Sequence, residues 1–193
     1  QLLREGIVLR GTSDTEVLLQ SILFFGLEAT LTKLQGMYAF AFYDAAHTEL
    51  VLVRDPMGIK PLVYTSAPGT QVFVFASELR ALRAMLPHSS TVSPAAVESF
   101  FRHGSIEQPL SLYERLSFLP PGAILRVSVE TGRQQALRFF NTLDLAELTR
   151  SPTTLSNPEI ITHTRESLHR AIRGALTADV PVGVLLSGGI DSA

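Results

Sequence analysis

The sequence predicts an α+β domain built from antiparallel hairpins, followed by the first helix and strand of an α/β domain. Three observations lead to this prediction: paired strand patterns early in the chain, a polar stretch rich in turn residues, and a late apolar segment that ends in a glycine pair. We therefore expect a first domain over residues 1–140, a linker over 141–157 and the start of a second domain over 158–193.

The composition excludes several classes of protein. Hydrophobic residues make up 46% of the chain and charged residues 18%, so a substantial core can be buried. The net charge is only −2 and no apolar run approaches the ~18 residues of a membrane span, so we expect neither a nucleic acid nor a membrane as a partner. The absence of cysteine excludes disulfides, cysteine zinc sites and a cysteine nucleophile within these residues.

The helices of the first domain are signalled by their caps. Ser13 and Glu16 stand in capping-box spacing, the apolar residues that follow recur at helical intervals, and Gly26 closes the pattern. Ser93 and Pro94 similarly begin a later helix. Helices are predicted over residues 13–26, 77–86 and 93–104. The opening "QLLREG" resembles the last turn of a helix, so we expect both ends of the chain to be cut from a longer protein.

Strand patterns alternate with these helices. Aromatic and β-branched residues cluster in short runs that are separated by polar turns, which is typical of β-hairpins. The predicted strand pairs are 37–43 with 50–53, 61–64 with 72–76, and the two arms of 120–140 on either side of Thr131-Gly132. The first hairpin is expected to lie in a well-buried sheet.

The second domain is expected to begin with a helix and a buried strand. Residues 157–159 start a helix that continues to about Leu176, with apolar residues at spacings of four and seven. The segment 180–187 is apolar and β-branched, as in a parallel strand that is covered on both faces. A Gly-Gly turn and a second helix from about residue 190 would follow.

This turn has the properties of a phosphate site. Two glycines let a ligand approach the main chain, and the free N–H groups of a following helix favour an anion. Asp191 cannot bind phosphate directly, but its carboxylate can hold a Mg²⁺ ion that does. We expect ATP and Mg²⁺ as cofactors. The predicted ATP-binding residues are Leu186, Ser187, Gly188, Gly189, Asp191 and Ser192.

Other readings of the turn are weaker. A Walker loop requires a lysine after the glycines, and none is present. A nucleophile elbow requires a glycine where Leu185 stands, so Ser187 is a poor candidate nucleophile. A plain Gly-Gly turn with an Asp-Ser helix cap needs no ligand. The remaining match, S-G-G-x-D-S after a strand, resembles the pyrophosphate loop of the ATP pyrophosphatases.

The blocks "GTSDTEVLL", "LQGMYAFAFYD", "RDPMGIKPLVY", "FASELRAL" and "LPPGAILRV", followed by this loop, resemble glutamine-hydrolysing asparagine synthetase in the same order. The resemblance runs from about Gly11 to Ala193. It implies a class II glutamine amidotransferase domain, with the αββα sandwich of the N-terminal nucleophile hydrolases, joined to an ATP-pyrophosphatase synthetase domain. It also implies that the parent enzyme converts aspartate to asparagine through an acyl-adenylate, using ammonia from glutamine.

The resemblance further implies that Asp14 holds the α-amino group of bound glutamine, for which an anion is suited. Its alternative role is stabilisation of a helix dipole. Arg54 and Asp55 are expected to pair, and Lys60 to be structural. The catalytic N-terminal cysteine is absent, so this fragment alone is expected to be inactive. We expect a cytoplasmic enzyme with small-molecule substrates (glutamine, aspartate and ATP), and a homodimer is an open option.

Related enzymes remain alternatives. Proteins that close β-lactam rings or lasso peptides share the ATP loop, and in them the glutaminase half can be an inactive scaffold. Class II glutaminases joined to sugar-phosphate chemistry are disfavoured, because those partner domains lack the SGGIDS loop. A degraded module that keeps only its packing is the non-enzymatic alternative.

Overall fold

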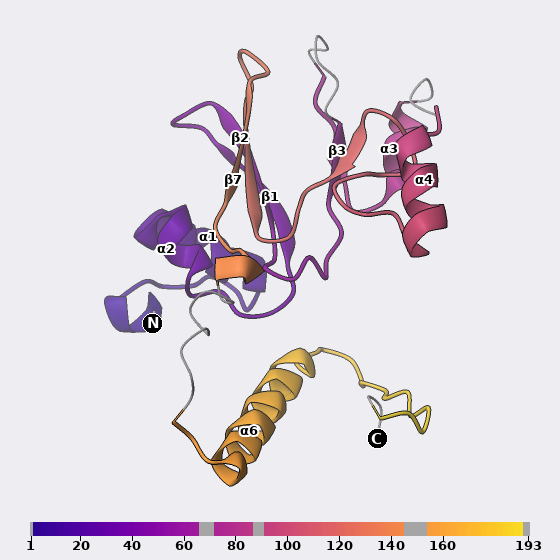
Figure 1. Ribbon diagram of the computed structural model, residues 1–193. Helices are drawn as coiled ribbons and strands as arrows, with labels where there is room; N and C mark the ends of the chain where they lie inside the picture. Colours follow the sequence, from indigo (N-terminus) through magenta and orange to yellow (C-terminus); the bar gives the residue numbers. More distant parts are fainter. Residues whose placement is uncertain (1, 66–71, 87–90, 145–153, 191–193) are drawn as a thin grey trace. The chain divides into compact units, whose positions relative to one another are not determined.

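The computed structural model describes residues 2–65, 72–86, 91–144 and 154–190 (Figure 1). It divides the chain into two compact units, Gln1–Arg150 and Ser151–Ala193. No helix in the described part of the chain is long and apolar enough to cross a membrane.

The first unit contains a four-stranded antiparallel sheet with the strand order β1-β2-β6-β7. Its strands are β1 (Ala39–Asp44), β2 (Glu49–Arg54), β6 (Ala123–Ser128) and β7 (Gln134–Arg138). Side chains alternate between the two faces of a strand, and β2 shows this directly. Val51 and Val53 pack on one face, whereas Leu50 and Leu52 pack on the other.

A second sheet has the order β4-β3-β5, also antiparallel. It consists of β3 (Val63–Thr65), β4 (Phe75–Ala76) and β5 (Leu116–Phe118). Tyr64 and the adjoining residues Leu62 and Leu119 pack against the Leu52 face of the first sheet. The two sheets therefore share an apolar core between them.

Helices cover the outer faces of both sheets. The helices α1 (Asp14–Phe25) and α2 (Leu27–Leu31) contribute to the core on the Val51 face of the first sheet. On the far side of the second sheet lie α3 (Leu79–Met85), whose Leu82 is buried, and α4 (Pro94–His103) (Figure 1). A short 3₁₀ helix, η1, spans Leu2–Glu5. The order helix, sheet, sheet, helix confirms the predicted αββα sandwich.

Most predicted elements are present, with differences at short ones. Gly26 ends α1 at a φ of 81°, as expected, but the chain then forms α2, which the sequence did not signal. The predicted strand over 72–76 is reduced to Phe75–Ala76. Strand β5 was also not anticipated, because a three-residue run has too little periodicity to be recognised.

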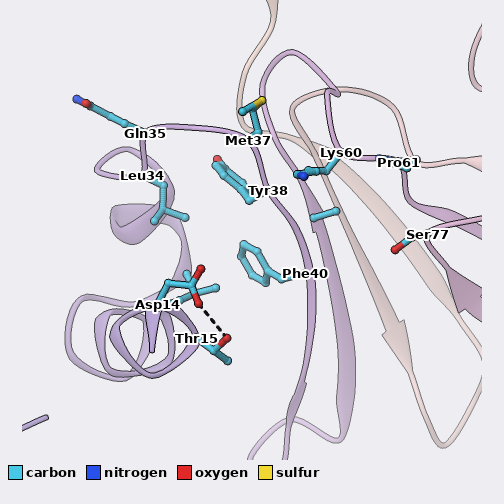
Figure 2. Close-up of a pocket in the computed structure, with 12 residues that line it drawn as sticks. Asp14, Thr15, Leu34, Gln35, Met37, Tyr38, Phe40, Lys60, Pro61 and Ser77 are labelled. Carbon is cyan, nitrogen blue, oxygen red and sulfur yellow. Dashed lines mark hydrogen bonds between the residues drawn. The ribbon is translucent and has the colours of Figure 1, made fainter. Parts of the chain in front are cut away.

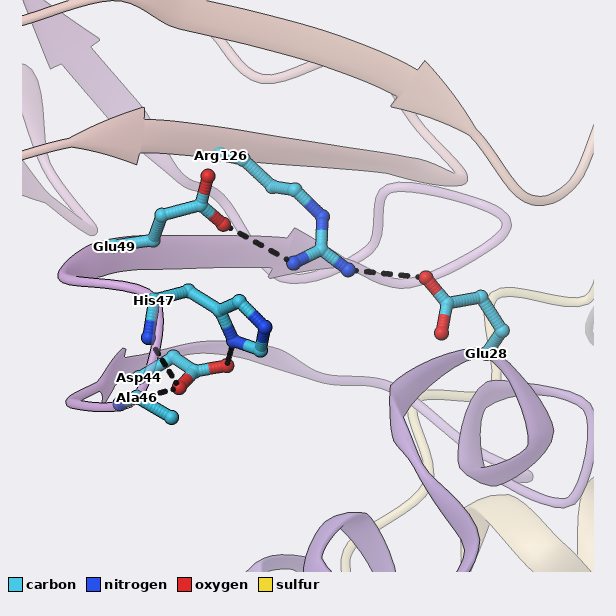
Figure 3. A network of polar contacts seen from close by, with 6 residues as sticks. All are labelled: Glu28, Asp44, Ala46, His47, Glu49 and Arg126. Carbon is cyan, nitrogen blue, oxygen red and sulfur yellow. Dashed lines mark hydrogen bonds and ion pairs between the residues drawn. The ribbon is translucent and has the colours of Figure 1, made fainter.

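Polar contacts tie the first sheet to α2 (Figure 3). The Arg126 guanidinium on β6 pairs with Glu49 on β2 at 3.3 Å and with Glu28 on α2 at 3.0 Å. In the turn after β1, the Asp44 carboxylate accepts hydrogen bonds from the backbone of Ala46 and His47 and contacts the His47 ring at 2.9 Å. The side-chain contact with His47 is the main cause of the lowered Asp44 pKa.

The second unit is dominated by α6 (Asn157–Ala175). The Glu159 carboxylate accepts hydrogen bonds from the backbone and hydroxyl of Ser156, and both bonds lower the Glu159 pKa. Residues 180–187, predicted as a buried strand, are exposed and form no ladder with any described residue, so this prediction differs from the structure. A strand forms only by pairing with a neighbour, and the part of the chain that the structure describes contains no strand paired with this segment.

Candidate active site

The turn after β2 is held by a buried arginine. Arg54 is 2% exposed, and its guanidinium donates to the carbonyl oxygens of Lys60 (2.8 Å), Gly58 (2.7 Å) and Leu119 (2.6 Å). It also donates to Oε1 of Gln108 at 2.7 Å. Burial lowers the Arg54 pKa, and the charge of Asp55 opposes this effect. The arginine therefore fixes the path of the turn mainly through neutral acceptors.

Asp55 binds the same turn from its other side. The carboxylate is 1% exposed and accepts hydrogen bonds from the backbone N–H groups of Met57 (3.1 Å), Ile59 (3.0 Å) and Lys60 (3.0 Å). The expected Arg54–Asp55 ion pair is absent from the described residues, which corrects the sequence prediction. Each side chain instead forms hydrogen bonds with backbone groups. The three N–H donors stabilise the buried charge of the Asp55 carboxylate without a cation beside it.

The first turn of α1 presents Asp14. Ser13 caps the helix by accepting a hydrogen bond from Thr15 N at 3.2 Å. Glu16 does not complete the predicted capping box; its carboxylate reaches back to the N–H groups of Arg10 (2.7 Å) and Gly11 (2.8 Å). These two hydrogen bonds fix the loop before the helix. Asp14 itself is exposed, and its carboxylate accepts a hydrogen bond from the Thr15 hydroxyl at 3.3 Å.

Asp14 lines a pocket of about 610 Å³ in the first unit (Figure 2). The polar side chains of its wall come from α1, from the segment before β1, from the turn after β2 and from the start of the α3 region. They include Asp14, Thr15, Tyr38, Lys60 and Ser77. Phe40, Leu18 and Leu34 add apolar surface. A concave site with a few convergent polar groups is typical of small-molecule binding.

Tyr38 is a pocket residue that the sequence analysis missed. Its hydroxyl oxygen is buried and has no hydrogen-bond partner among the described residues. Burial, and secondly the charge of Asp55, raises the Tyr38 pKa to about 12. Nothing in the sequence marks this tyrosine, because an aromatic residue beside a strand is usually part of the core.

The predicted phosphate loop lies in the second unit and is described by itself. Gly188 has a φ of 76°, a conformation that side chains disfavour, and the Gly189 N–H lies 3.4 Å from Oγ of Ser187. This backbone fits the close approach expected of a phosphate. Leu186 is exposed. Asp191 and Ser192 lie outside the described residues, and no cluster of three potential metal ligands occurs within the described ones.

Comparisons with known proteins match both parts of the chain. Residues 1–139 match the family model of the glutamine amidotransferase domain, and residues 163–193 match that of asparagine synthase. Asparagine synthetase [glutamine-hydrolyzing] 1 of Bacillus subtilis is 30% identical over 192 residues, which are 100% of this chain and 29% of that protein. Amidase chyE of Penicillium rubens is 30% identical over 183 residues, covering 94% of this chain and 26% of the amidase.

Among solved structures, the glutamine phosphoribosylpyrophosphate amidotransferase of B. subtilis, complexed with ADP and GMP, aligns with a TM-score of 0.48 and 26% identity. The alignment covers 72% of this chain and 25% of that one. The chain thus spans less than a third of the length of these relatives.

Proposed function

Since the chain belongs to the glutamine amidotransferase domain family, we propose that it forms the glutamine-binding part, and the start of the synthetase part, of a longer enzyme that makes asparagine. In this proposal glutamine is hydrolysed in the first unit. The ammonia then displaces AMP from an activated β-carboxylate of aspartate. No cysteine occurs among these residues, so in this proposal the catalytic nucleophile belongs to another part of the longer enzyme.

The position of Asp14 carries the proposal for the first unit. Its carboxylate lies in the first turn of a helix, on the wall of a pocket large enough for an amino acid. A carboxylate without an ion-pair partner in the described residues can bind the ammonium group of glutamine by a charge-assisted hydrogen bond. Helix-dipole stabilisation explains an acidic residue here, but it does not explain the pocket.

The glycine loop supports the ATP-dependent step. The backbone around Gly188 would bind the phosphates of ATP, together with the hydroxyls of Ser187 and Ser192. Asp191 would hold Mg²⁺, which neutralises the phosphate charge during transfer of the adenylyl group. Leu186 and Gly189 complete the proposed ATP site. Asparagine formation is the favoured outcome because asparagine synthetase 1 of B. subtilis aligns with the whole chain.

A related amide-forming enzyme is the second candidate. The similarity to amidase chyE, at the same 30% identity, shows that relatives at this level carry different names. In a β-lactam or lasso-peptide cyclase the glutaminase half would be a scaffold, and the attacking amine would belong to the substrate itself. Exchange of labelled pyrophosphate into ATP would then require a carboxylate substrate other than aspartate.

The test uses the full-length protein. We expect ammonia release from glutamine, and aspartate-dependent exchange of labelled pyrophosphate into ATP. Formation of asparagine from either glutamine or added ammonium would establish the complete reaction. Pyrophosphate exchange without glutamine hydrolysis would favour the cyclase alternative, and the absence of both activities would refute an enzymatic role.

A further inference from the structure

The Glu16 carboxylate binds the bend that leads into α1. The main chain bends over residues 10–12 and enters the helix at Asp14. One oxygen of Glu16 accepts a hydrogen bond from the N–H of Arg10 at 2.7 Å, and the other accepts from the N–H of Gly11 at 2.8 Å. A single side chain therefore holds two consecutive N–H groups of the bend with both of its oxygens.

This carboxylate is the main support of the bend. Within the described part of the chain, the main chain of residues 8–12 forms no hydrogen bonds other than the two to Glu16. An irregular segment without such bonds would satisfy its N–H groups with water and sample several conformations. Glu16 is partly buried, so its own position is restricted by the surrounding residues. It therefore sets the direction from which the chain enters the helix.

Asp14 is the residue whose placement depends most on that direction. It is the first residue of α1, and a residue at this position has no intrahelical partner for its N–H. Its side chain is held by a hydrogen bond of 3.3 Å from the Thr15 hydroxyl, which Figure 2 shows as a dashed line. The carboxylate lies on the side of the helix that faces Phe40 in this view. A shift of the bend would therefore move the Asp14 carboxylate within the pocket.

We propose that Glu16 is a positioning residue: by binding the N–H groups of the bend, it orients the Asp14 carboxylate toward the ammonium group of the bound amino acid. This inference rests on the proposed function, and it concerns a residue that is not part of the pocket wall. Two other roles would also explain an acidic residue here, namely interaction with the helix dipole and long-range attraction of the ammonium group. Both require only the charge of Glu16, whereas the proposed role requires the length of its side chain.

Three substitutions of Glu16 separate length from charge in the full-length enzyme. Glu16→Ala should raise KM for glutamine about tenfold and change kcat for ammonia release less than about twofold, because binding is weakened without a change in the chemical step. Glu16→Asp keeps the charge, but its side chain is one methylene shorter and does not reach both N–H groups, so its KM should be close to that of Glu16→Ala. Glu16→Gln keeps the length and one acceptor oxygen, so its KM should rise only about threefold.

The order of the variants decides between the roles. A role that depends on charge alone predicts the reverse order, with Glu16→Asp close to the wild type and Glu16→Gln close to Glu16→Ala. That order would overturn the proposal, as would three variants whose KM for glutamine equals that of the wild type. Synthesis from added ammonium should be unchanged in all three, since it does not use the glutamine pocket.

A double-mutant cycle tests whether Glu16 acts through Asp14. In a protein that already carries Asp14→Asn, the further change Glu16→Ala should raise KM for glutamine by less than about twofold, because the charge that Glu16 orients is already lost. The full tenfold effect in this background would show that Glu16 acts independently of Asp14, and the proposal would be wrong. A merely structural glutamate gives no such dependence on Asp14.

Glu98→Ala is the matched control. Glu98 is an exposed helix glutamate of the same unit, and its carboxylate pairs with Arg102 at 2.8 Å on α4. This variant should leave KM for glutamine unchanged. If the wild-type enzyme releases ammonia from glutamine but the cycle is additive, the role of Glu16 is refuted while the proposed function stands. If the wild-type enzyme neither binds nor hydrolyses glutamine, the proposed function fails, and this inference fails with it.

Discussion

The Arg54 guanidinium donates a 2.6 Å hydrogen bond to the carbonyl oxygen of Leu119, a residue distant in the sequence. This contact joins the end of β2 in the first sheet to the segment that follows β5 in the second. Arg54 also holds the carbonyl groups of Gly58 and Lys60. One buried side chain therefore fixes the pocket turn relative to both sheets.

Replacement of Arg54 should be strongly destabilising. Arg54→Met keeps the apolar stem but leaves the Leu119, Gly58 and Lys60 carbonyl groups without this donor, so we expect a loss of about 3–5 kcal/mol in unfolding free energy. Urea denaturation measures it. Arg126→Met is the control: its ion pairs with Glu28 and Glu49 are partly exposed, and the expected loss is about 1 kcal/mol or less. Equal losses in the two variants would contradict the role given to Arg54.

Gly58 should not tolerate a side chain. Its φ is +64°, and a Cβ atom would lie 2.8 Å from Pro121 Cγ and 3.2 Å from Arg54 Cζ. Gly58→Ala is expected to cost about 2–4 kcal/mol, the sum of backbone strain and the clash. At Gly132, with a φ of +70° and open space around it, alanine meets only the strain and should cost about 1 kcal/mol. Thermal unfolding of both variants compares the two sites, and similar melting temperatures would refute the steric argument.

Alkaline pH should destabilise the fold through Tyr38. Its pKa is raised from 10.0 to about 12 by burial, so the unfolded chain loses the phenolic proton before the folded chain does. The resulting stability is fully present below pH 10 and is lost as the pH rises toward 12. In Tyr38→Phe, the decline in urea midpoint over this range should be shallower than in the wild type. The control is Tyr43→Phe: Tyr43 is 55% exposed, so this variant should follow the wild-type curve. An identical decline in all three proteins would show that Tyr38 titrates normally.

Replacement of Asp14 should impair the reaction with glutamine but not the reaction with added ammonium. In the full-length enzyme, Asp14→Asn removes the charge that is proposed to bind the glutamine ammonium group, so KM for glutamine should rise about 10–100-fold. Synthesis from added ammonium should be preserved. Steady-state assays with each nitrogen source test this, and an equal loss with both would return Asp14 to a purely structural role at the helix N-terminus.

The complementary variant lies in the second unit. Asp191→Asn should abolish pyrophosphate exchange and synthesis from either nitrogen source, because the proposed Mg²⁺ ligand is lost. Glutamine hydrolysis should continue. Loss of both activities would argue against separate sites for ammonia release and ATP use.

Much of the secondary structure could be predicted because its signals are local. Ser13, Gly26 and the Ser93-Pro94 pair mark helix ends through backbone geometry that depends on neighbouring residues alone. Strands β1 and β2 are likewise marked in the sequence by two runs of aromatic and β-branched residues on either side of a short polar turn. The short elements α2, β4 and β5 were missed or misjudged, because tertiary packing selects them and their own pattern is weak.

The sequence by itself determined the order of the longer helices and strands of the first unit, the family resemblance and, through it, Asp14 as a candidate ligand. Only the tertiary structure decided which groups each charged side chain contacts, because these contacts depend on which segments lie close together in the folded chain. Arg54 and Asp55 are neighbours in the chain, yet each is satisfied by different backbone groups. Lys60 and Tyr38 are separated along the chain but line one pocket, since β1 and β2 pair as neighbouring strands of one sheet.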